Sequence, residues 1–133
     1  MAQKPNYLIL VMGNFMDLKI WKIAHELTLE VYKLTSKLPK EEIFSLTSQL
    51  RRAAISVVSN IAEGESRYSS KDKLNFFIQA RSSATEIQAQ LLLIHNLYPK
   101  LSRQTMILKD KYEILSKQIN SFISFRRMQN ETK

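Results

Sequence analysis

The sequence contains no cysteine and has only 2 glycines, 3 prolines and 2 histidines in 133 residues. Without cysteine the chain can form no disulfide framework, zinc-thiolate site, iron–sulfur cluster or thiol nucleophile. So few glycines and prolines cannot supply the many tight turns of a β-sandwich or barrel. The two histidines leave little material for acid–base catalysis. These absences favour long helices with few connections.

The sequence also lacks a hydrophobic stretch that could cross a bilayer, which needs about 20 residues. Its apolar run at residues 7–12 is short and is not followed by a small-residue cleavage site, so it does not indicate a signal peptide. We therefore expect a cytoplasmic protein that does not bind membranes. We expect residues 1–15 to be a poorly ordered leader, 16–127 to form one domain and 128–133 to be a polar tail.

The sequence does carry an excess of positive charge. There are 20 lysines and arginines against 12 aspartates and glutamates, so the formal net charge is +8. Such a balance favours polyanionic partners, RNA or DNA among them, but it carries no information about fold.

Four segments repeat apolar residues in steps of three and four, which is typical of amphipathic helices. The first, residues 18–37, follows a candidate N-cap at Asp17 and ends before Pro39. The second, residues 46–63, is expected to end at Gly64, which tolerates the left-handed cap conformation.

The third segment begins with Ser69 and Asp72 at capping-box spacing and continues to about Tyr98, which makes it the longest expected helix. Ser102 is expected to cap the fourth. Four such helices with short connections predict an all-α, antiparallel up-down-up-down four-helix bundle. The predicted core stripes are Ile20, Ala24, Leu27, Val31, Leu34, Leu38, Leu46, Leu50, Ala53, Val57, Ile61, Phe77, Ala80, Ala84, Ile87, Leu91, Ile94, Leu108, Tyr112, Leu115, Ile119 and Phe122.

Polar residues form a second stripe on the second helix. If the second and third helices fold back near Arg67, Arg52 lies near Glu86, and Asn60 lies near Asn75. One interpretation is a structural polar network that holds the bundle together, made of Arg52, Asn60, Glu63 and Glu86. The alternatives are a ligand-binding or subunit-binding surface, and an enzyme site in which Glu63 or Glu86 acts with Arg52.

Conventional catalytic and metal motifs are absent from the sequence. His25 has no second histidine four residues away, and His95 stands alone, so neither belongs to a zinc motif. There is no glycine-rich phosphate loop and no nucleophile elbow. We expect no cofactor, no metal, no small-molecule substrate and no enzymatic activity.

Five basic residues are the candidate nucleic-acid contacts, because they can neutralise phosphates without reading bases: Arg51, Arg67, Lys71, Lys73 and Arg81. Tyr68, beside Arg67, could stack on an exposed base. The alternative interpretation is ordinary solvated charge.

Trp21 and Tyr32 lie outside the core stripe of the first helix and are candidates for an oligomer interface. Two large aromatic side chains off the principal stripe indicate either a broad buried face or a second contact surface. We therefore expect a homo-oligomer.

Several motifs of the chain resemble one known family, the 23S rRNA intervening-sequence proteins. The resemblance covers about residues 15–98 and is carried by residues 17–27, 32–35, 38–42, 46–54 and above all Ser59-Asn60-Ile61-Ala62-Glu63-Gly64. These are small bacterial four-helix bundle proteins, some of them encoded within insertions in large-subunit ribosomal RNA genes. The resemblance implies a homopentameric ring of bundles. It also implies kinship to the accessory variability determinant of diversity-generating retroelements, a basic bundle that works with nucleic acid and a reverse transcriptase.

The sequence thus leads to a non-enzymatic, self-associating helical bundle that binds RNA or DNA through phosphates. The alternative is a structural or protein-partner adaptor that does not bind nucleic acid.

Overall fold

The computed structural model describes residues 14–131, and every regular element in that range is helical. The leader expected at residues 1–15 therefore lies outside the described residues, except for Asn14 and Phe15. Four long helices are joined by short helical turns. The long helices are α2 (Lys19–Thr35), α3 (Ser48–Ser66), α4 (Ser70–Leu97) and α5 (Ser102–Glu131), and the turns are η1 (Phe15–Asp17), η2 (Lys40–Glu42), η3 (Ile43–Thr47) and η4 (Pro99–Leu101).

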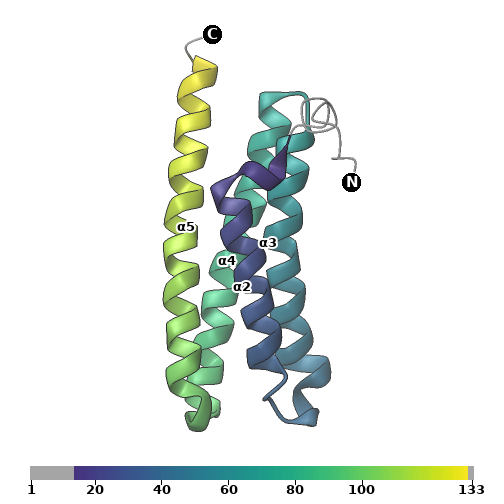
Figure 1. Cartoon of the computed structure of the whole chain (residues 1–133), viewed down its shortest axis with the longest axis vertical. Helices are drawn as coiled ribbons and strands as arrows, with labels where there is room; N and C mark the ends of the chain where they lie inside the picture. Colours follow the sequence, from purple (N-terminus) through teal and green to yellow (C-terminus); the bar gives the residue numbers. More distant parts are fainter. Residues whose placement is uncertain (1–13, 132–133) are drawn as a thin grey trace, which may run out of the picture.

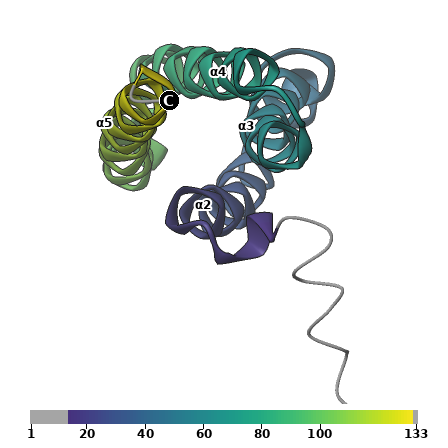
Figure 2. The ribbon, with the colours of Figure 1, turned by 90° about the horizontal axis from the view of Figure 1, so that it is seen from above.

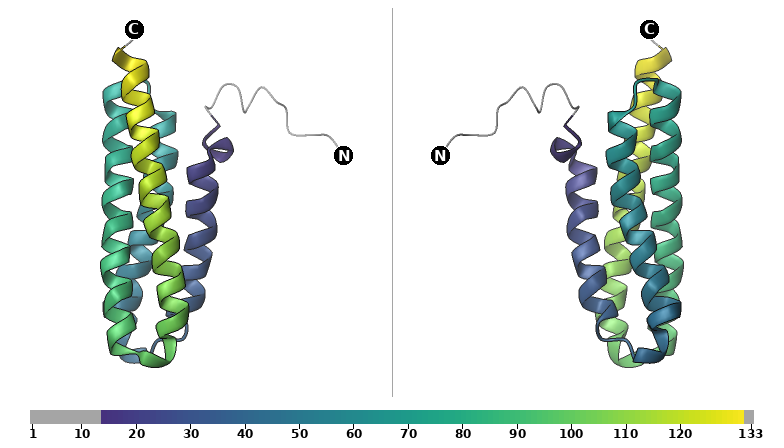
Figure 3. Two further views of the ribbon diagram at one scale, coloured as in Figure 1. Left: turned by 90° about the vertical axis from the view of Figure 1, so that its left-hand side faces the viewer. Right: turned by 90° about the vertical axis from the view of Figure 1, so that its right-hand side faces the viewer.

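Neighbouring helices run in opposite directions, which confirms the predicted four-helix bundle (Figure 1). Seen from above, each long helix occupies one corner, and α2 meets both α3 and α5 (Figure 2). The connections α2–α3 and α4–α5 lie at one end, called here the loop end. The α3–α4 turn lies at the other, called the turn end, where α5 extends beyond the other helices (Figure 3). Of the described helices, none is long and apolar enough to span a membrane.

The buried core coincides with the predicted apolar stripes. All of their residues are buried except Phe122, which is partly buried and packs against the core. Ala54 and Ile123 are also buried, so the apolar faces of α3 and α5 are wider than the stripes alone indicated. Removal of this apolar surface from water holds the four helices together.

The helix starts differ in part from the expected caps. Ser69 does cap α4, because its Oγ accepts from the amide of Asp72 at 3.0 Å. Asp17 does not cap α2: it lies in η1, and Leu18 precedes the helix without a side-chain cap. Ser102 is already helical, with φ −55° and ψ −48°, because Pro99 starts a 3-10 turn that leads directly into α5.

The expected terminator Gly64 lies inside α3, which continues to Ser66. Gly64 is buried against Phe77 of α4, so glycine is present here because the two helices approach closely. The helix ends instead at the extended residue Arg67.

The longest helix is α5, with 30 residues against 28 in α4, contrary to the expected order. Apolar residues continue along α5 to Ile123 and beyond, and the helix includes residues 128–131 of the expected polar tail.

Candidate nucleic-acid interface

The five candidate contacts do not lie on one surface. Arg51 is in the first turn of α3 at the loop end, whereas Arg67, Lys71 and Lys73 surround the turn end. At about 1.5 Å of rise per residue, roughly 24 Å of helix separates Arg51 from Arg67. Arg81 lies on α4, where its Nη1 donates to Oδ1 of Asn120 on α5 at 2.8 Å.

The cations of the turn end are mostly neutralised within the protein. Nη2 of Arg67 lies 3.2 Å from Oε2 of Glu63, and the guanidinium lies 4.7 Å from the centre of the Phe76 ring. Nζ of Lys73 donates to the carbonyl of Glu65 at 3.0 Å. Lys71 is exposed and has no acidic partner among residues 14–131.

Glu65 links three helices at this end. Its carboxylate accepts two hydrogen bonds from Nη2 of Arg126, at 2.8 and 3.2 Å, and lies 3.9 Å from Nζ of Lys73. Arg126 also stacks over the ring of Phe122, 4.6 Å from its centre. The charges at the turn end therefore connect α3, α4 and α5 to one another.

Arg51 is held differently at the loop end. Its Nε donates to Oγ1 of Thr35 at 2.8 Å, and its guanidinium lies 4.3 Å from the centre of the Tyr32 ring. Within the described range its two terminal nitrogens have no hydrogen-bond partner and no carboxylate. The side chain is thus oriented while its outer donors are free.

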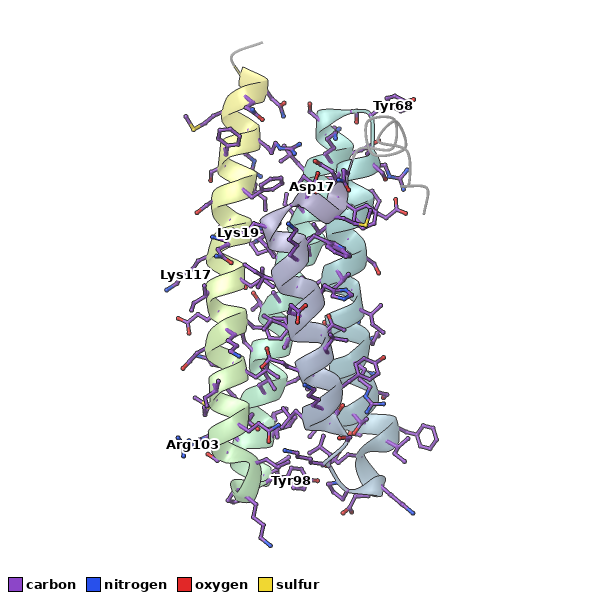
Figure 4. All side chains as sticks on the ribbon, viewed as in Figure 1. Asp17, Lys19, Tyr68, Tyr98, Arg103 and Lys117 are labelled. Carbon is purple, nitrogen blue, oxygen red and sulfur yellow. The ribbon has the colours of Figure 1, made fainter. Side chains whose placement is uncertain are left out.

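Other cations at the loop end also lack an acidic partner among the described residues. Sequence reasoning missed them because they come from separate segments that only the fold brings to one end. They are Lys33, Lys37, Lys40, Lys100 and Arg103, of which Lys37 donates to Oε1 of Gln104 at 2.9 Å. Figure 4 shows Arg103 and Tyr98 at this end and Tyr68 at the opposite one.

A hollow of about 500 Å³ opens beside Arg51, between the end of α2, the turns η2 and η3, and the start of α3. Its lining is mostly hydroxyl and cationic: Thr35, Ser36, Leu38, Lys40, Ile43, Thr47, Ser48 and Arg51. The nearby Glu42 is engaged elsewhere, since its carboxylate accepts from the Tyr98 hydroxyl and from the amide of Leu46. The lining of the hollow itself thus holds two cations and no acidic residue.

An exposed aromatic residue directly follows one of the lining residues in the chain. Phe44 follows the lining residue Ile43 and is 94% exposed. Tyr68, the aromatic residue noted in the sequence, is fully exposed at the turn end. Each end of the bundle thus presents an almost fully exposed aromatic ring to solvent.

The residues of the expected polar network form three separate groups. Arg52 pairs with Glu86 across α3 and α4, and its Nε donates to Oε1 of Gln49 at 3.1 Å. Glu63 does not join them, because it pairs with Arg67.

Asn60 forms the third group. Its Nδ2 donates to the carbonyl of Ser56 at 2.8 Å and to Oγ of Ser56 at 3.0 Å. The Ser56 hydroxyl in turn lies 2.9 Å from that of Ser83. Asn60 therefore does not reach Asn75 as expected, because the two helices fold back nearer Ser69 than Arg67.

The two interface candidates are engaged in contacts within the chain. Trp21 is partly buried, stacks on His25 with ring centres 5.1 Å apart, and meets Phe15 edge-on at the same distance. Tyr32 is 39% exposed and supports Arg51 on its ring.

His95 bonds to Oγ of Ser102 through Nδ1 at 2.6 Å. No three metal-ligating side chains gather within the part of the chain that the structure describes.

Comparison with known proteins gives one family. The model of the 23S rRNA-intervening sequence protein family matches residues 16–121, which include most of all four long helices. None of the curated proteins matches the chain.

Proposed function

The chain belongs to the 23S rRNA-intervening sequence protein family, and from that premise we propose that it is a self-associating bundle that binds RNA or DNA through phosphate contacts. We propose further that it acts in the cytoplasm and without enzymatic activity. The observation that carries the proposal is the set of cations at the loop end that have no acidic partner among residues 14–131. Phosphates can neutralise such cations at little cost, because no internal ion pair has to break.

The five candidate contacts have different parts in this proposal. Arg51 and Lys71 have free donors and can contact phosphates directly. Arg67, Lys73 and Arg81 would each have to give up an internal partner first. We therefore assign most of the affinity to the loop end.

A salt titration tests the proposal. Fluorescence anisotropy of labelled RNA and DNA strands should show affinity that falls steeply from about 50 to 300 mM salt. Joint substitution of Lys40, Lys100 and Arg103 by glutamine should weaken binding and reduce the slope by roughly two phosphate contacts. Lys109→Gln is the matched control, since that ammonium is already paired with Glu113 at 2.8 Å. An absence of binding at low salt would contradict the proposal.

Self-association is the second part of the proposal. Trp21 and Tyr32 are large aromatic residues that remain partly exposed on α2, where a second copy of the chain can cover them. Light scattering should give a multiple of the 15.5 kDa chain mass, five copies for a homopentamer, and Trp21→Ala should lower it. A monomeric mass would contradict this part alone.

A structural or protein-partner adaptor is the second candidate. The pairing of turn-end cations with Glu63 and Glu65 favours it, because those charges already have a role in holding the fold together. The adaptor predicts purification without nucleic acid, whereas the binding protein should carry nucleic acid through a low-salt purification. The ratio of nucleic-acid to protein absorbance distinguishes the two.

A further inference from the structure

We propose that the loop end binds a single-stranded segment of RNA or DNA, with one base stacked on Phe44 and the adjoining phosphate in the hollow beside Arg51 and Lys40. This inference rests on the proposed function and adds to it the form of nucleic acid and the place where it binds. It follows from the hollow, its free cations and the exposed aromatic residue that directly follows the lining residue Ile43.

Arg51 is prepared for a phosphate by its neighbours. The bond from its Nε to Thr35 and the ring of Tyr32 below it fix the plane of the guanidinium. The hydroxyl of Thr35 can accept this bond because it donates its own proton to the carbonyl of Val31 at 2.8 Å. Little side-chain entropy is then lost when the two free terminal nitrogens meet an anion, and a planar fork suits phosphate oxygens.

Lys40 adds a second positive charge to the lining of the hollow. The hydroxyls of Ser36 and Ser48 donate to backbone carbonyls, at 2.7 and 3.2 Å, so their protons are already committed. The two cations therefore provide the attraction. The lining itself holds no acidic residue, because Glu41 and Glu42 belong to the adjoining turn η2 and Glu42 accepts from Tyr98.

Phe44 gives the loop end its preference for single strands. A ring that is 94% exposed contributes little to the core, but it offers its faces to another aromatic system. Base–aromatic stacking is available to any base and is a regular feature of single-strand binding. Ile43 lines the hollow and Phe44 directly follows it, with consecutive Cα atoms about 3.8 Å apart, so we place the ring within one nucleotide of the phosphate site. A duplex keeps its bases stacked inside and cannot present one in this way.

The test compares two forms of one labelled RNA of about 15 nucleotides, a length that covers the usual single-strand site. One form is the free strand and the other is its duplex with the complement, and both are followed by anisotropy with the full chain. Phe44→Ala should weaken single-strand binding by about fivefold or more and duplex binding by less than about twofold. Phe44→Trp should bind the single strand as tightly as the unaltered chain does. Phe125→Ala is the control. It removes an aromatic ring that is 56% exposed on α5, and it should change the affinity for neither the single strand nor the duplex.

Arg51→Gln should weaken binding of the single strand and lower its salt slope by roughly one phosphate. Because Arg51 also contacts Thr35, circular dichroism and light scattering must show the same fold and mass as the unaltered chain. Phe44 makes no packing contact of that kind, so its variants test the inference even if the Arg51 variant unfolds. If Phe44→Ala weakens binding of the single strand and of the duplex equally, or weakens neither, this inference is overturned and the proposed function stays intact. Failure of the unaltered chain to bind either form would overturn both.

Discussion

A Cβ atom placed on Gly64 would lie 2.6 Å from Cε1 of Phe77, well inside van der Waals contact. The Phe77 ring is fully buried and packs edge-on against Phe122, with ring centres 4.9 Å apart. Because the ring is enclosed in this way, it cannot move aside without disturbing its neighbours. Gly64 therefore permits a close approach of α3 to α4 near the turn end.

Gly64→Ala should destabilise the fold by roughly 1–3 kcal/mol through overpacking. This loss should exceed the gain of about 1 kcal/mol that alanine normally brings to a helix interior. Urea unfolding followed by circular dichroism measures the difference. Ser59→Ala, at an exposed position of α3, is the control and should change stability by no more than about 0.5 kcal/mol. In a Phe77→Leu background, Gly64→Ala should lower the free energy of unfolding by less. If Gly64→Ala alone stabilises the protein, the contact with Phe77 is unimportant.

Gly64 also shows what the sequence could predict about the fold and what it could not. Apolar periodicity located the core on all four helices, because burial of a helical face needs apolar residues every three or four positions. The role of Gly64 depended on Phe77, thirteen positions later, and local reasoning could only read it as a helix terminator. The start of α5 was misjudged for a similar reason, since the turn at Pro99 overrides the capping preference of Ser102.

The candidate site was less predictable than the fold. Arg67, Lys71 and Lys73 cluster in the sequence, but sequence alone does not show that Glu63 and Glu65 lie within reach of two of them. The free cations of the loop end come from α2, η2, η4 and α5, so only the bundle topology brings them to one end. Charge counting predicted a basic protein, whereas the location of its unpaired charge depended on tertiary structure.

Glu65→Gln should destabilise the fold by roughly 1–3 kcal/mol, because it leaves Arg126 and Lys73 without a carboxylate in a mostly buried place. The Glu65 side chain is only 16% exposed. Glu63→Gln is the matched control on the same helix, since the Glu63 side chain is 53% exposed and its loss should cost less than about 1 kcal/mol. Thermal or urea unfolding of both variants checks the order, and equal costs would mean that the Glu65 contacts contribute no more than a surface pair.

The Arg52–Glu86 pair should contribute little to stability despite its place in a predicted network. The two side chains are 52% and 38% exposed, so water screens the interaction. A double-mutant cycle with Arg52→Ala and Glu86→Ala should give a coupling of about 0.2–1 kcal/mol, and added salt should lower it. A coupling above about 2 kcal/mol would instead identify the pair as a main support of the bundle.

Tyr98 should make the loop end sensitive to alkaline pH. A hydrogen bond to the Glu42 carboxylate, together with burial and the charges of Glu42 and Glu41, raises the pKa of Tyr98 from 10.0 to about 12. The folded chain therefore keeps the phenol proton at pH values where the unfolded chain has lost it. The stability that this bond contributes is complete below about pH 10 and is lost as the pH rises through about 12.

Tyr98→Phe removes both the hydrogen bond and this titration. Its urea midpoint should fall less between about pH 10 and 12 than that of the unaltered chain, because part of the alkaline loss comes from Tyr98 itself. The phenolate absorbance step near pH 12 should also disappear. Lysine deprotonation and Tyr112, whose pKa burial raises as well, affect both proteins equally and cancel in the comparison. Parallel pH profiles for the two proteins would mean that the Tyr98–Glu42 bond does not survive in solution, and η2 would then be held to α4 by packing alone.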